Sequence, residues 1–216
     1  MPYFNIVAET SENTVVTEYE PVKKRSDSYQ SEAALEQEFI RLLCEQGYEY
    51  LPIHTEKDLI ANLRKKLEEL NNYQFSDTEW DDFFKNAVAN PNEHIVEKTR
   101  KMQEDNVQVL TRDDGSSKNI TLIDKKNIHN NRLQVINQYV IGTENGAKHD
   151  NRYDVTVLVN GLPLVHIELK RRGVAIREAF NQINRYQRDS FWAGCGLYEY
   201  CLLYTSPSPR DISGSR

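Results

Sequence analysis

Residues 152–170 read RYDVTVLVNGLPLVHIELK. β-Branched and other apolar residues lie on both sides of Asn160-Gly161, a dipeptide typical of tight hairpin turns. The pattern predicts two antiparallel strands with different faces, because successive side chains on a strand point in opposite directions. The odd-numbered positions form an apolar core face: Val155, Val157, Val159, Pro163, Val165, Ile167 and Leu169. The even-numbered face becomes polar away from the turn.

The length of the turn decides which side chains meet across the hairpin. A two-residue loop would pair odd with even positions and mix the two faces. We therefore predict a three-residue loop, Val159-Asn160-Gly161, with Gly161 in the left-handed conformation and a G1 bulge. This loop pairs Leu158 with Leu162 and keeps the even positions together.

In that register Asp154 lies near His166 and diagonally from Glu168, and Lys170 shares their face. Carboxylate oxygens suit Mg²⁺, and a bound Mg²⁺ can activate water at a phosphodiester. A nearby lysine can neutralise the developing charge. The simpler alternative is a salt bridge at the end of a hairpin. His166 could tune a metal ligand, although a structural histidine is the commoner case.

The hairpin resembles the core of the PD-(D/E)xK nuclease superfamily, which bears an aspartate followed by Glu-x-Lys. Here Asp154 follows Tyr153 instead of the proline of that motif. The resemblance also implies an assisting glutamate on the preceding helix, which is Glu36 or, alternatively, Glu32.

The same resemblance implies the roles of the hairpin residues. Asp154, Glu168 and the Leu169 backbone carbonyl are the expected Mg²⁺ ligands, with Glu36 assisting through water. Lys170 is expected to position the attacking water or to stabilise the leaving phosphate.

A narrower resemblance covers residues 1–200. SEAALEQEFIRLLCEQGYEYL, NRYDVTVLVNGLPLVHIELKRRG, AFNQINRYQRDSFWAG and GLYEY are similar to the N-terminal nuclease region of the restriction (HsdR) subunit of type I restriction–modification enzymes. Gln182 and Tyr186 match that family's Gln-x-x-x-Tyr motif, which implies active-site support or a DNA contact. An ordinary amphipathic helix is the alternative. Basic residues beside the motif are candidate phosphate contacts, although solvated helix charges are the usual case: Lys170, Arg171, Arg172, Arg177, Arg185 and Arg188.

The resemblance implies a type I site-specific deoxyribonuclease domain that acts with Mg²⁺ on double-stranded DNA. The implied partners are methyltransferase and specificity subunits in the bacterial cytoplasm. ATP would serve the motor part of a full-length subunit, since these 216 residues lack a Gly-x-x-x-x-Gly-Lys-Ser/Thr phosphate loop. The alternative function is a non-catalytic scaffold that docks the motor and methyltransferase subunits.

The rest of the chain predicts an α/β (α+β-like) fold, with a restriction-endonuclease-like mixed β-sheet flanked by helices. The net charge is −6, no apolar run is long enough for a membrane span, and the three cysteines lack metal-ligand spacing. We expect an arm at 1–30 with a short strand near 14–18, a nuclease domain at 31–200, and a tail at 201–216 that resembles non-native sequence. Within the domain we expect a helix at 31–46, a strand at 48–53, a helical insertion at about 55–105, a hairpin around Asp114-Gly115, a strand at 132–142 and a helix at 176–189.

Overall fold

The computed structural model describes residues 3–9, 15–20, 31–141, 151–169, 197 and 202–205. The chain divides into two units, Met1–Gln30 and Ser31–Arg216. In the first unit, β1 (Tyr3–Glu9) and β2 (Val15–Glu20) pair antiparallel. The strand predicted near residues 14–18 corresponds to β2, whereas β1 was not predicted.

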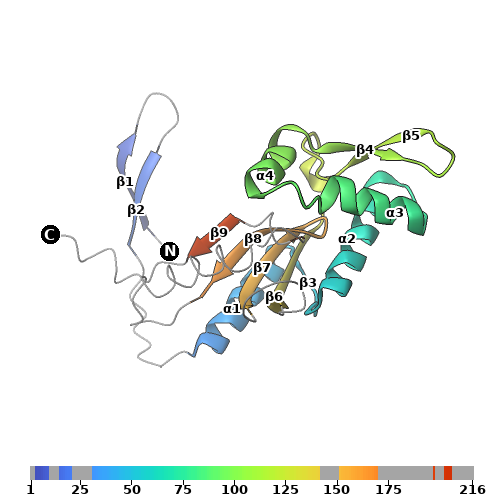
Figure 1. The fold of residues 1–216 in the computed structure, drawn as a ribbon. Coiled ribbons are helices and arrows are strands. Elements are labelled where there is room, and N and C mark those ends of the chain that lie inside the picture. The colour runs from blue at the N-terminus through green and yellow to red at the C-terminus, as the bar shows by residue number, and fades with distance from the viewer. Residues whose placement is uncertain are drawn as a thin grey trace. The chain divides into compact units, whose positions relative to one another are not determined.

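A five-stranded sheet forms the centre of the second unit (Figure 1). Its strands, in spatial order, are β3 (Glu49–Tyr50), β6 (Leu133–Ile141), β7 (Asn151–Val159), β8 (Leu162–Glu168) and β9 (Leu202–Thr205). β6, β7 and β8 are antiparallel neighbours, while β3 and β9 run parallel to the strands they join. This mixed sheet with flanking helices confirms the predicted α/β class and is consistent with a restriction-endonuclease-like fold.

Helices cover both faces of the sheet. α1 (Glu32–Glu45) contributes Leu35, Phe39, Ile40 and Leu43 to an apolar cluster with Val135, Val155 and Leu169. α2 (Glu56–Asn71) contributes Leu59, Leu63 and Leu67 to a second cluster that contains Ile136, Leu158 and Leu162. The even-numbered leucines near the turn, Leu158 and Leu162, are thus buried by α2, on the face opposite to α1.

The helices begin where their capping residues predict. Ser31 accepts a hydrogen bond from the Ala34 amide at the start of α1, and Thr55 accepts one from the Asp58 amide at the start of α2. Ser76 forms a capping box with Glu79 at the start of α3 (Asp77–Phe83).

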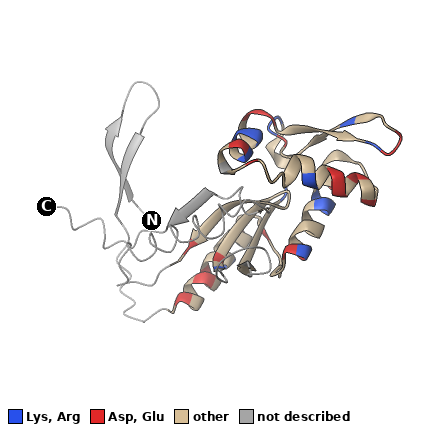
Figure 2. Cartoon of the chain, in the orientation of Figure 1, with Lys and Arg blue, Asp and Glu red and all other residues tan. Residues whose placement is uncertain are grey.

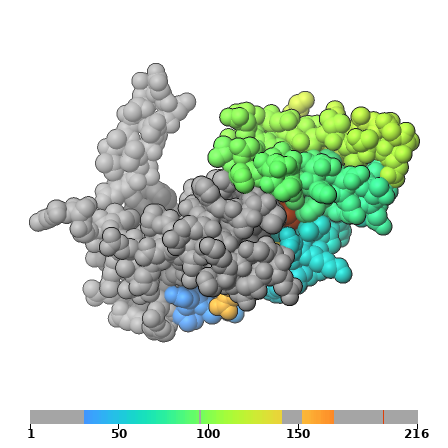
Figure 3. Space-filling view, in the orientation of Figure 1, coloured from blue at the N-terminus to red at the C-terminus, as the bar shows by residue number. Residues whose placement is uncertain are grey.

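The remaining elements lie between α3 and β6. They are η1 (Phe84–Val88), α4 (Ile95–Glu104), the β4–β5 hairpin (Val107–Thr111 and Ser117–Thr121) and η2 (Ile128–Asn130). The hairpin around Asp114-Gly115 is thereby confirmed. With α2, the segments from α3 to β5 form one continuous region of the visible surface (Figure 3).

The turn between β7 and β8 differs from the prediction. Val159 pairs with Leu162, so the loop has two residues, Asn160 (φ 52°) and Gly161 (φ 84°), as in a type I′ turn. The extra residue that keeps the faces together lies inside β8 instead, because Val157 pairs with Val165 while Leu158 pairs with Pro163. The predicted three-residue loop is wrong, yet a bulge within the strand produces the shift that the loop was expected to supply.

Packing against α2 explains the tight turn. A Cβ atom on Gly161 would lie 2.6 Å from Leu63 Cα, so only glycine allows the helix backbone to approach this closely. The buried Asn160 side chain accepts from the Arg132 amide and donates to the Leu122 carbonyl at 3.0 Å. These contacts fix the turn between α2 and the segment that leads into β6.

Two further findings concern the chain beyond the hairpin. Residues 202–205, within the predicted non-native tail, pair with β8 as β9. No helix in the described part of the chain combines the length and the apolar content needed to cross a membrane.

Candidate active site

Asp154 and Leu169 are joined directly. The Leu169 amide donates to Asp154 Oδ2 at 2.9 Å, just beyond the end of β8. Val155 pairs with Ile167, so continuing the register places Asp154 opposite Glu168 and not next to His166, as the three-residue loop had predicted. The structure thus brings the β7 carboxylate to the backbone of the residue whose carbonyl is an expected metal ligand.

The Glu168 side chain is fully buried beside a histidine. Its Oε2 lies 3.5 Å from His166 Nε2, and neither side chain is exposed. The Tyr153 ring packs edge-on against the His166 ring, with 4.7 Å between centroids. His166 therefore lies between a tyrosine and the second predicted carboxylate, which fits a structural role in holding Glu168.

Glu36 and Glu32, the two candidates on α1, differ in their surroundings. Glu32 is exposed in the first turn, whereas Glu36 is buried against the sheet. Asn137 Nδ2 donates to Glu36 Oε1 at 2.6 Å, and Gln138 Nε2 donates to Glu36 Oε2. Of the two glutamates, Glu36 is the one that contacts the central strands.

Asn137 and Gln138 were not singled out from the sequence. The signal that could have found them is an Asn-Gln pair within the otherwise apolar strand LQVINQYVI. These half-buried amides pair with a group on another element, and such partners cannot be identified from strand periodicity.

The donor set suits Mg²⁺, which prefers carboxylate and carbonyl oxygens and retains water. The carboxylate of Asp154, one predicted ligand, accepts from the amide of Leu169, whose carbonyl is another, and Glu168 precedes Leu169. Within the described ranges, no group of three or more His, Cys, Asp and Glu side chains is arranged to hold a metal ion. The predicted site differs from such a group because it combines two carboxylates with a backbone carbonyl.

The other predicted site residues lie outside the residues that the structure describes. They are Lys170, Arg171, Arg172, Arg177, Gln182, Arg185, Tyr186 and Arg188. The predicted helix at 176–189 lies outside them as well.

Charged residues are unevenly distributed over the described elements. Figure 2 shows β7 and β8 mostly uncharged, while acidic residues recur along α1 and basic residues mark α2 and α4. Asp154 and Glu168 are the acidic residues of these two strands, and Arg152 is their one basic residue besides His166.

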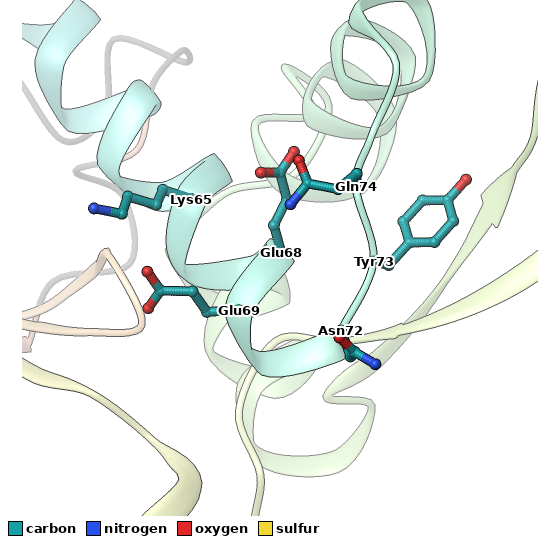
Figure 4. Close-up of a pocket in the computed structure, with 6 residues that line it drawn as sticks. All are labelled: Lys65, Glu68, Glu69, Asn72, Tyr73 and Gln74. Carbon is teal, nitrogen blue, oxygen red and sulfur yellow. The ribbon is translucent and has the colours of Figure 1, made fainter.

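A separate pocket of about 330 Å³ lies at the C-terminal end of α2 (Figure 4). Its acidic residues already have structural partners. Glu68 accepts from Arg64 Nε at 3.2 Å and from the Phe75 amide at 3.1 Å, and Glu69 accepts from Lys66 Nζ at 3.0 Å. These contacts hold the helix end in place, and we assign the pocket no role in the chemistry.

The family model of the type I restriction enzyme R protein N terminus matches residues 29–207. The chain is 47% identical over 206 residues to the type I restriction enzyme EcoprrI endonuclease subunit of Escherichia coli, covering 95% of this chain and 64% of that protein. It is 38% identical over 181 residues to the SsaAORF53P endonuclease subunit of Staphylococcus saprophyticus, covering 82% of this chain and 18% of the relative. It is 31% identical over 179 residues to the HindI endonuclease subunit of Haemophilus influenzae, covering 73% of this chain and 17% of the relative.

The chain thus spans about two thirds of the length of one curated relative and less than a fifth of the other two. The family match includes the whole hairpin, from Asp154 to Lys170, and α1 with Glu36. From this match and these identities, the chain belongs to the family of type I restriction enzyme R protein N-terminal domains.

Proposed function

We propose that this chain is a Mg²⁺-dependent endonuclease domain that hydrolyses DNA phosphodiester bonds as part of a type I restriction enzyme. The observation that carries the proposal is the 2.9 Å contact between Asp154 Oδ2 and the Leu169 amide. It places one expected metal ligand, the Asp154 carboxylate, against the backbone of Leu169, the residue whose carbonyl is another expected ligand. Family membership and the names of the relatives, which are endonuclease subunits, support the same function.

Each residue has a distinct task in this proposal. Asp154, Glu168 and the Leu169 carbonyl would hold Mg²⁺, which when bound would stabilise charge on the phosphate and activate water. Lys170 would orient the attacking water or stabilise the leaving phosphate. Glu36 would accept a hydrogen bond from water at the site. The basic residues after Lys170 and the pair Gln182 and Tyr186 would hold the DNA backbone or support these groups.

The wider context is also part of the proposal. The domain would act on double-stranded DNA together with methyltransferase and specificity subunits in the bacterial cytoplasm. The choice of DNA site would belong to those partners. ATP hydrolysis would belong to a motor region outside this sequence, since the chain contains no phosphate-binding loop of that type.

One observation favours a second candidate, a non-catalytic scaffold. The Glu168 carboxylate is fully buried and lies 3.5 Å from His166 Nε2. Such a position is what a residue with a purely structural role would have. A scaffold could keep Asp154 and Glu168 for the stability of the hairpin and still dock other subunits. The two functions differ in what removal of a single functional group does to cleavage.

The test is Mg²⁺-dependent DNA cleavage by the full endonuclease subunit in its assembled complex. Asp154→Ala and Lys170→Ala should each reduce the cleavage rate by roughly a hundredfold or more, because each removes a group that stabilises the transition state. Asp82→Ala, which removes an exposed carboxylate on α3, is the matched control and should cleave like the parent. Circular dichroism and melting temperature establish that the variants fold.

Cleavage that persists at the parent rate in folded Asp154→Ala and Lys170→Ala variants would contradict the nuclease proposal and favour the scaffold. Loss of cleavage with retained folding and retained binding of the partner subunits would contradict the scaffold. Testing the variants in the assembled complex matters, since the partners are proposed to deliver the DNA.

A further inference from the structure

Glu36 is a carboxylate in an apolar environment. The residue is only 8% exposed, and its helix neighbours Leu35, Phe39 and Ile40 pack against the cluster of sheet residues below α1. A buried carboxylate is costly unless hydrogen-bond donors replace water. Asn137 and Gln138, two successive residues of β6, supply one donor to each carboxylate oxygen.

Successive residues on a regular strand point to opposite faces, so these two side chains should not reach the same group. They do so because Gln138 has a left-handed backbone, with φ 52°. Residues with a Cβ atom seldom adopt this conformation, and such positions are concentrated at functional sites. Asn137 pairs with Val155 and Tyr139 pairs with Tyr153, so the strained residue lies opposite Asp154.

A third side chain fixes the orientation of the Asn137 amide. The Tyr50 hydroxyl, from the adjacent strand β3, donates to Asn137 Oδ1 at 2.9 Å. With its oxygen engaged by Tyr50, the Asn137 amide presents its NH₂ group to Glu36. Glu36 is therefore held at both oxygens by groups that belong to the sheet.

We propose that Asn137 and Gln138 are positioning residues for the DNA-cleavage reaction, holding the Glu36 carboxylate at the level of Asp154 as an acceptor for water at the Mg²⁺ site. Each carboxylate oxygen can accept more than one hydrogen bond, so the two amides fix the orientation and still leave room for water. This role rests on the proposed nuclease function. It also accounts for the left-handed backbone at Gln138, which a strand serving only as packing would not need.

The deciding variant is Gln138→Gly. Glycine adopts a positive φ without strain, so the substitution relieves the backbone and removes only the amide donor. Asn72→Gly is the matched control, because Asn72 also has a left-handed backbone (φ 45°) but caps α2 away from the site. If Gln138 serves only the fold, Gln138→Gly and Asn72→Gly should show the same dependence on Mg²⁺.

Two measurements use the full endonuclease subunit. The first is the Mg²⁺ concentration that gives half-maximal DNA cleavage by the assembled complex. The second is the rise in melting temperature that Mg²⁺ alone causes in the subunit without DNA. For Gln138→Gly we expect the required Mg²⁺ concentration to increase about 10- to 100-fold, the usual effect of removing a group that orients a metal site. The melting-temperature rise should shift to higher Mg²⁺ in parallel, with both quantities unchanged in Asn72→Gly.

Parent-like Mg²⁺ dependence of Gln138→Gly in both measurements would overturn the inference, as would an equal shift in Asn72→Gly. If Gln138→Gly does not fold, Asn137→Ala takes its place. It should show the same shift to higher Mg²⁺ concentration, and parent-like Mg²⁺ dependence would again overturn the inference. If Asp154→Ala abolishes cleavage while these variants retain normal Mg²⁺ dependence, only the positioning role fails. If Asp154→Ala cleaves normally, the nuclease proposal itself fails.

Discussion

The turn between β7 and β8 gives a quantitative test of how α2 packs on the sheet. Gly161 and Gly115 both have positive φ, 84° and 78°, so alanine at either position pays the left-handed strain of about 1–2 kcal/mol. Only at Gly161 would the new Cβ atom meet a neighbour, Leu63 Cα at 2.6 Å and Leu63 N at 3.0 Å. Those atoms belong to the helix backbone and cannot rotate away. Overpacking of this kind adds about 1–3 kcal/mol.

Gly161→Ala should therefore destabilise the fold by roughly 2–5 kcal/mol, against about 1–2 kcal/mol for Gly115→Ala. The assay is urea unfolding followed by tryptophan fluorescence, since Trp80 is buried in the cluster that contains α2. A difference of about 2 kcal/mol corresponds to roughly 4–8 °C in melting temperature for a chain of this size. Equal losses for the two variants would refute the close approach of α2 to the turn.

The remaining predictions concern the hydrophobic core, the stability at low pH and surface ion pairs. Leu63→Ala should cost about 2–5 kcal/mol in urea unfolding because Leu63 is fully buried, and a loss below about 1 kcal/mol would contradict its place in the core. Burial alone would raise the pKa of Glu79, but hydrogen bonds from the Ser76 amide and the Tyr73 hydroxyl lower that pKa below the usual 4.5. The resulting stabilisation is present above about pH 4.5 and is lost as the pH falls through the lowered folded-state pKa. In Glu79→Gln the free energy of unfolding should therefore depend less steeply on pH in the acid range. An unchanged midpoint of acid unfolding would contradict this prediction. Arg41→Ala should leave the melting temperature close to that of the parent despite two ion pairs on α1, because its side chain is 53% exposed, and a large drop would contradict this.

The sequence by itself determined most of the local structure. Capping residues fixed the starts of α1, α2 and α3, since Ser31, Thr55 and Ser76 accept backbone hydrogen bonds within their own first turns. Alternating apolar residues located β6, β7 and β8, and Asp114-Gly115 located the β4–β5 hairpin. All of these depend on groups a few residues apart, which is why they can be predicted from the order of residues alone.

The sequence also identified the candidate site, though not its geometry. Asp154, Glu168 and Leu169 were selected from strand periodicity and a family resemblance, and in the structure Asp154 contacts the Leu169 backbone. The predicted register was wrong, because the extra residue lies at Leu164 in β8 and not in the turn, which places Asp154 opposite Glu168 and not His166. The alternation of apolar residues shows that the hairpin needs one extra residue to keep its faces together. It does not show whether that residue lies in the turn or within a strand.

Only the tertiary structure decided that the turn stays tight. Gly161 must admit the backbone of α2, and the helix lies about a hundred residues earlier in the chain. The same holds for Glu36, whose partners Asn137 and Gln138 come from a strand on another part of the sequence and reach it through one left-handed residue. Local pattern determines which segments become helices and strands. The contacts between segments distant in the sequence determine where each strand shifts and which polar groups meet, because those choices depend on the space left by the other elements.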